Sequence, residues 1–114
     1  MSFLAEITRL LTGLGFRVET GVLSGESPEE YVVITPMSDT FVYHADNSPM
    51  YETQEARLSL FSKGNYIKRK NQIVRELLAR KFLITARVYV DHEDDTGYHH
   101  YAIDVEKHYE AAYG

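Results

Sequence analysis

Apolar residues at helical spacing predict a helix at the start of the chain, with a buried stripe of Leu4, Ile7, Leu10, Leu11 and Leu14. Glu6 and Arg9 fall outside this stripe, on the side expected to face solvent. Ser2 is suited to cap the first turn, and Gly13 or Gly15 to end the helix.

The next segments carry the shorter period of β-strands. Residues 16–20 predict a short strand, followed by a solvated loop over 21–30. Residues 31–37 and 40–46 are β-rich runs separated by a polar break, which predicts a hairpin. In residues 51–64, apolar and polar positions alternate, as in a half-buried strand.

A second helix is predicted over residues 66–81, with Asn65 as its cap and a buried stripe of Ile67, Ile73, Val74, Leu77 and Leu78. Residues 82–90 and 98–109 are the last two strands, and their short, polar, glycine-bearing connection predicts an antiparallel hairpin. The expected class is α+β, with two helices packed on a mainly antiparallel sheet in the order α-β-β-β-β-α-β-β.

Length and composition fit one globular domain over residues 1–114, with 44% hydrophobic residues. Cysteine is absent, which excludes disulfides and thiolate metal sites. No run approaches the roughly 18 apolar residues of a membrane span. Glu6 and Arg9 interrupt the apolar region that a signal peptide would need. We therefore expect a soluble protein of intracellular origin.

Charge is segregated in the second half of a chain whose formal net charge is −5. Between residues 63 and 81, Glu76 is the single acid among seven cations: Lys63, Lys68, Arg69, Lys70, Arg75, Arg80 and Lys81. Between residues 91 and 110, Lys107 is the single cation among seven acids: Asp91, Glu93, Asp94, Asp95, Asp104, Glu106 and Glu110. Segregated charge of this kind is a possible signal of contacts with charged partners.

The segment "HEDDTGYHHY", residues 92–101, is the strongest candidate for chemistry. It fails the EF-hand pattern, since Thr96 stands where glycine is needed and Ala102 where the last glutamate is needed. It also fails the zincin pattern, because a second histidine four residues after His92 is missing. We interpret it as a hairpin turn, with a looser metal or acid–base site as the weaker hypothesis.

The histidines of this segment alternate between the two faces of the predicted strand. His99 shares a face with Tyr101 and Ile103, which predicts a partly buried, hydrogen-bonded ring. His100 lies on the other face, which we expect to be the wetter one. His92 and one of these two histidines would have to meet across the hairpin to form a metal site.

Other catalytic signatures are missing from the sequence. Ser24 does not stand in the G-x-S-x-G elbow, and "GLG" is too short for a dinucleotide site. Glu29 and Glu30 are paired carboxylates, but they belong to the predicted loop. We therefore expect no enzyme, no catalytic residue, no cofactor and no bound metal.

The basic stretch over residues 65–81 raises two further hypotheses. It could bind the phosphates of a nucleic acid. We favour a solvated helix face instead, because the sequence pI is about 5.5. Alternatively, the acidic hairpin of one copy could meet the basic helix of another and give a head-to-tail ring. The same charges could instead neutralise each other within one subunit.

Two stretches also carry a family resemblance. "MYETQEARLSLFSKGNYIKRKNQIVRELL" and "FLITARVYVDHEDDTGYHHYAIDVEKHY" resemble the small tail-completion proteins of long-tailed bacteriophages. These proteins are also described as tail terminators, tail-to-head joining proteins or minor capsid proteins. The opening helix and "YVVIT" agree with that layout, so the resemblance extends over most of the chain.

The resemblance implies an α+β subunit that caps or joins the tail tube, usually as a ring. It implies contacts with the tail-tube protein and with head-completion proteins, no cofactor, no reaction, and a place in the virion after assembly in the host cytoplasm. The charge pattern, independently, predicts that subunit or partner contacts are made by Lys68, Arg69, Lys70, Asp91, Glu93, Asp94 and Asp95.

Overall fold

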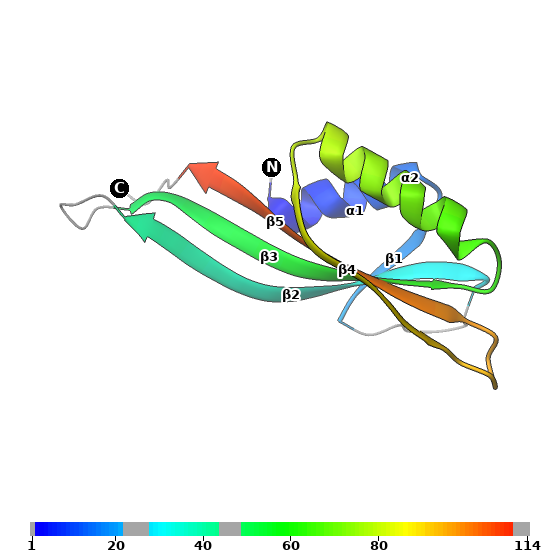
Figure 1. Cartoon of the computed structure of the whole chain (residues 1–114). Coiled ribbons are helices and arrows are strands. Elements are labelled where there is room, and N and C mark those ends of the chain that lie inside the picture. The colour runs from blue at the N-terminus through cyan, green and yellow to red at the C-terminus, as the bar shows by residue number, and fades with distance from the viewer. Residues whose placement is uncertain (1, 22–27, 44–48, 111–114) are drawn as a thin grey trace.

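The computed structural model describes residues 2–21, 28–43 and 49–110. Its elements, in chain order, are α1 (Phe3–Gly13), β1 (Arg17–Thr20), β2 (Glu30–Tyr43), β3 (Pro49–Ser62), α2 (Tyr66–Ala79), β4 (Leu83–His92) and β5 (His99–Glu110). The strands form one sheet in the order β1-β2-β3-β5-β4, antiparallel except for the β1–β2 pair. Both helices lie on one face of the sheet (Figure 1). The predicted α+β class with two helices on a mainly antiparallel sheet is confirmed.

The predicted hairpin between residues 31–37 and 40–46 is wrong, and part of its second run lies outside the described residues. β2 continues as one strand of 14 residues. Met37 is an extra residue where the register with β3 shifts, between Pro36 and Ser38. β1 pairs with β2 only as far as Ile34, so Pro36 lies on an open edge where its missing N–H interrupts no ladder.

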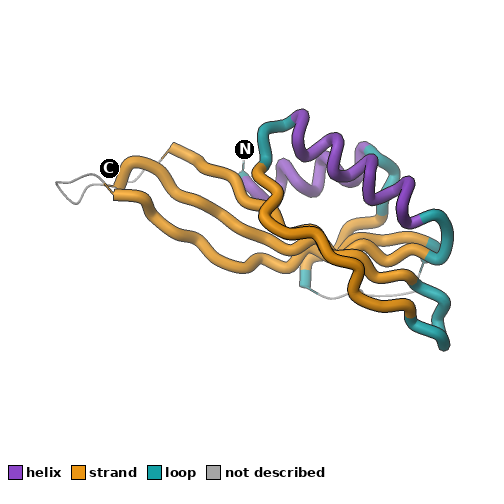
Figure 2. Tube along the Cα trace, viewed as in Figure 1, coloured by secondary structure: helices purple, strands orange, loops and turns teal. Residues whose placement is uncertain are grey.

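The main core lies between the helices and the sheet. Ile7 and Leu11 from α1 and Ile73 and Leu77 from α2 are fully buried there. They pack on the helix-facing side chains of β2, β3 and β5: Val32, Ile34, Ala56, Leu58, Leu60, Tyr101, Ile103 and Val105. Figure 2 shows the two helices together above the central strands. The described part of the chain thus has a core along one face of its sheet.

The helix caps follow the sequence closely. The Ser2 side chain accepts a hydrogen bond from the N–H of Ala5, and the Asn65 side chain accepts one from Lys68. The predicted stripe of α2 is partly wrong, since Ile67 is 52% exposed and Leu78 57% exposed. Each lies about 100° around the helix from the residue before it, Tyr66 or Leu77, and so points away from the contact between the helix and the sheet.

The opposite face of the sheet has a smaller apolar cluster next to the β4–β5 hairpin. Tyr31, Val33 and Tyr98 are buried, and Phe61 packs against them. The Tyr31 and Phe61 rings stack with their centroids 4.7 Å apart. The Tyr98 hydroxyl donates a hydrogen bond to the carbonyl of Pro28, which ties the segment before β2 to this cluster.

β4 is an edge strand and is exposed along nearly its whole length. Its exposed apolar side chains include Leu83, Val88, Tyr89 and Val90. The register with β5 shifts twice, so that Thr85 and Val90 are each one residue more than the partner strand supplies. Edge strands with such irregularities are harder to extend by main-chain pairing with another chain.

Candidate interaction surface at the end of the β4–β5 hairpin

A tight turn closes the β4–β5 hairpin, as the sequence predicts. The N–H of Glu93 donates to the carbonyl of Tyr98 at 2.8 Å, and the N–H of Gly97 donates to the carbonyl of Glu93 at 2.7 Å. Gly97 has φ +82°, a conformation that glycine adopts without a steric cost. The Thr96 hydroxyl donates to the Glu93 carboxylate at 2.8 Å. These bonds fix the turn, with Asp94 and Asp95 at its tip.

The four predicted acids differ in their surroundings. Asp94 and Asp95 are exposed at the tip of the turn, and the Asp94 side chain is 99% exposed. Asp91 is exposed opposite His100, on the face that the helices do not cover. Glu93 is half-buried and holds Thr96. We refer to Asp91, Glu93, Asp94 and Asp95 as the acidic tip, within which Asp94 and Asp95 are the most accessible.

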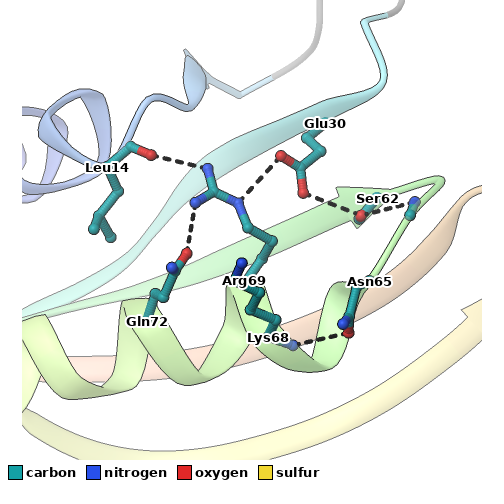
Figure 3. A network of polar contacts seen from close by, with 8 residues as sticks. Leu14, Glu30, Ser62, Asn65, Lys68, Arg69 and Gln72 are labelled. Atoms are coloured by element: carbon teal, nitrogen blue, oxygen red, sulfur yellow. Dashed lines mark hydrogen bonds and ion pairs between the residues drawn. The ribbon is translucent and has the colours of Figure 1, made fainter.

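Arg69 is held inside the subunit by a network of polar contacts (Figure 3). Its guanidinium donates to the Glu30 carboxylate at 3.1 Å, to the Gln72 side chain at 2.6 Å and to the carbonyl of Leu14 at 2.9 Å. Its central carbon lies 3.9 Å from the centre of the Phe16 ring. These bonds join α2 to the end of α1 and the start of β2. Arg69 therefore has a structural role within the subunit.

The other predicted cations lie nearer to solvent. Lys68 is exposed on the first turn of α2. The Lys70 ammonium lies 4.9 Å from the centre of the Tyr101 ring, and the Lys63 ammonium lies 4.9 Å from the centre of the Tyr98 ring. We refer to Lys63, Lys68 and Lys70 as the basic turn. Of the predicted basic residues, Lys68 and Lys70 thus remain candidates for contacts with a partner.

The acidic tip and the basic turn lie at the same end of the molecule. Tyr66, the first residue of α2, stacks on His99, the first residue of β5, with ring centroids 4.8 Å apart. Figure 1 shows the start of α2 beside the β4–β5 hairpin end, away from the distal part of β2 and β3. None of the ion pairs among the described residues joins the tip to the basic turn. The two groups of charges therefore share one end of the molecule but are not paired by direct contact.

His92 and His99 meet across the hairpin. They are direct partners in the β4–β5 register, and their ring centroids lie 4.6 Å apart. The Asp94 carboxylate lies 3.2 Å from Nδ1 of His92, and the Tyr89 hydroxyl lies 3.0 Å from Nδ1 of His99. His99 is half-buried on the core side of the sheet and hydrogen-bonded, which confirms that prediction.

The prediction that His100 lies on the wetter face is wrong. Its ring stacks on Phe61 with centroids 4.3 Å apart, and its Nε2 atom is buried without a hydrogen-bond partner among the described residues. Burial lowers the pKa of His100, since the neutral ring loses less hydration than the charged one. The sequence did not reveal the aromatic cluster that Tyr31, Phe61 and Tyr98 build on this face.

The exposed apolar side chains of β4 were not identified as a candidate site from the sequence. Val88 is 49% exposed and lies in one cross-sheet row with Ala102, Ser59 and Val33. This row separates the aromatic cluster from the ion pair of Arg57 and Asp104, whose atoms approach to 2.7 Å. The consecutive apolar residues Val88, Tyr89 and Val90 were the available signal, because an edge strand that packs on one face alternates instead.

Comparisons with known proteins give no family for this chain: no family model matches it, and no curated protein matches it. Among the described residues, no helix is long and apolar enough to cross a membrane. In the same part of the chain, no group of three or more histidine, cysteine, aspartate or glutamate side chains is arranged to hold a metal ion.

Proposed function

We propose that this chain is a non-enzymatic structural subunit of a bacteriophage or prophage, which completes the tail or joins tail to head as part of a ring. One observation carries the proposal: a basic turn and an acidic tip share one end of the subunit without pairing to each other. Complementary potentials of this kind give partner selection and register between copies. The resemblance of residues 50–78 and 82–109 to tail-completion proteins supports the same function.

The exposed apolar side chains of β4 supply the second requirement of an assembly subunit. Charged rims contribute little affinity by themselves, and the larger part comes from apolar area removed from water. Leu83, Val88 and Val90 are each about half exposed. We propose that β4 packs against a neighbouring copy through these side chains, while the tip and the basic turn align the two copies. The tail-tube protein and head-completion proteins are the proposed partners on the ring's two sides.

Binding of nucleic acid through residues 65–81 is the second candidate function. The contacts of the cations weigh against it, because Arg69 is bonded within the subunit and Lys70 lies over the Tyr101 ring. Lys68 then stands beside a hairpin end with four acids, a poor surface for a phosphate backbone. A gel-shift assay at low salt separates the two functions, since retarded DNA or RNA would favour this second candidate.

Charge reversal tests how copies pair. Lys68→Glu with Lys70→Glu should weaken self-association measured by sedimentation velocity over a salt series, and so should Asp94→Lys with Asp95→Lys. Arg75→Glu, an exposed reversal further along α2, is the matched control and should leave association unchanged. Arg69 is left intact in these variants because its reversal would damage the fold.

Mixing the two reversed proteins is the sharpest form of this test. The reversed basic turn of one protein then meets the reversed acidic tip of the other, so alternating copies should associate again. Association that is indifferent to salt and to both reversals would contradict pairing by charge. Electron microscopy of the protein incubated with purified phage tails, which should show added density at a tail end, tests the tail function itself.

A further inference from the structure

The β4–β5 hairpin brings together two imidazoles whose chemistry the assembly function does not use. His92 and His99 are paired in register and lie on the helix-covered face, whereas His100 lies on the opposite face. The rings are tilted by 39° with centroids 4.6 Å apart. A tilt of this size brings one edge of each ring closer than the centroids are. The fold itself therefore places two potential metal ligands side by side.

The hydrogen bonds of the two rings leave the same nitrogen uncommitted on each. Nδ1 of His92 faces the Asp94 carboxylate, and Nδ1 of His99 faces the Tyr89 hydroxyl. Neither Nε2 atom has a hydrogen-bond partner among the described residues. A carboxylate on the far nitrogen of an imidazole orients the ring and strengthens it as a ligand, which is the usual outer shell of a histidine metal site.

We propose that His92 and His99 bind a divalent transition-metal ion of the zinc, copper or nickel class through their Nε2 atoms. Nitrogen ligands at about 2.0–2.1 Å from such an ion lie roughly 3.3 Å apart in tetrahedral geometry. His99 is held by the Tyr66 ring, whereas His92 is exposed at the end of β4, so rotation of the His92 side chain closes the site. Imidazole suits these metals and not magnesium or calcium, which prefer oxygen ligands.

Two protein ligands leave the other coordination positions to water or to a donor from a neighbouring molecule. The site is therefore open and its metal exchangeable, unlike a closed structural zinc site. Asp94 is assigned to His92 and Glu93 is bonded to Thr96, so neither of these two acids completes the coordination of the ion.

Titration of the purified, untagged chain with ZnCl₂ tests the proposal by calorimetry and by NMR of the imidazole nitrogens. We expect saturable binding, with shifts at His92 and His99 and none at His108. His92→Asn should weaken binding at least tenfold, and Asp94→Asn about tenfold through loss of the outer carboxylate. Because His99 packs on Tyr66, loss of zinc binding in His99→Ala counts only if the circular dichroism spectrum is unchanged. If the spectrum changes, the variant of the exposed His92 decides whether the site exists.

Controls make each outcome decisive. His108→Ala, at the other end of β5, and His44→Ala, outside the described residues, should bind zinc like the parent chain. MgCl₂ at the same concentration should produce no response. The proposal is overturned by absence of zinc binding, by binding that survives His92→Asn, or by binding lost in either control variant.

Discussion

Arg69→Ala is the substitution whose effect follows most directly from the structure. The guanidinium makes three hydrogen bonds, to Glu30, Gln72 and the carbonyl of Leu14, and covers the Phe16 ring. The Arg69 side chain is 19% exposed and that of Glu30 is 30% exposed, so water screens the ion pair only in part. Truncation removes all these contacts at once and leaves the Leu14 carbonyl without this donor.

The expected loss of stability lies between two limits. An exposed ion pair contributes about 0–1 kcal/mol, and a hydrogen bond to a charged group about 1.5–3 kcal/mol when it is shielded from water. Contacts that share one side chain do not add fully. We therefore expect Arg69→Ala to lower the free energy of unfolding by about 2–4 kcal/mol, a large share of the roughly 5–15 kcal/mol typical of a small domain.

Urea unfolding followed by circular dichroism measures this loss as a lower midpoint at an unchanged slope. Lys68→Ala is the matched control on the same turn, and its change should stay within about 0.5 kcal/mol. Arg69→Lys should recover less than half of the loss, because an ammonium cannot reproduce the planar fork of the guanidinium. An Arg69→Ala midpoint equal to that of Lys68→Ala would refute the role assigned to this network.

Three further predictions concern the core, the pH dependence and the second cluster. Leu77→Ala should cost about 2–5 kcal/mol in urea unfolding, whereas Leu78→Ala, on the exposed side of α2, should cost little; equal losses would contradict the helix orientation. Burial opposes ionisation of Glu6, but hydrogen bonds from Tyr109 and Lys107 lower its pKa below the ordinary 4.5. Its stabilising contribution is thus present above that value and is lost as pH falls through the folded-state pKa, so Glu6→Gln should flatten the acid limb of a stability–pH curve. Tyr98→Phe should cost about 1 kcal/mol through the lost bond to Pro28, and Tyr98→Ala about 3–5 kcal/mol through the lost ring; near-neutral Tyr98→Ala would contradict a second cluster.

Local pattern predicted the elements whose residues contact near neighbours in the chain. The α1 stripe, the Asn65 cap and the alternation in β3 depend on spacing within one element, and each agrees with the structure. The continuity of β2 was missed because a proline and polar residues usually end a strand. They are tolerated here because β1 is too short to cover that part of the edge.

The candidate site was predictable only in part for a related reason. Charge runs located the basic turn and the acidic tip, but they could not show which cations are already bonded. Arg69 meets Glu30 and Leu14, which lie 39 and 55 residues away in the sequence. His100 likewise depends on Phe61 of another strand. Such pairings are set by sheet register and helix packing, which period and composition do not encode.

The irregular register of β4 bears on how the protein behaves at high concentration. A regular strand edge can template addition of one copy after another, and repeated addition leads to fibrils. With Thr85 and Val90 out of step with β5, the longest regular stretch of this edge runs from Ala86 to Tyr89. So short a stretch gives little main-chain affinity for pairing along β4. An apolar strand can thus stay at the surface without offering a long regular edge for main-chain pairing.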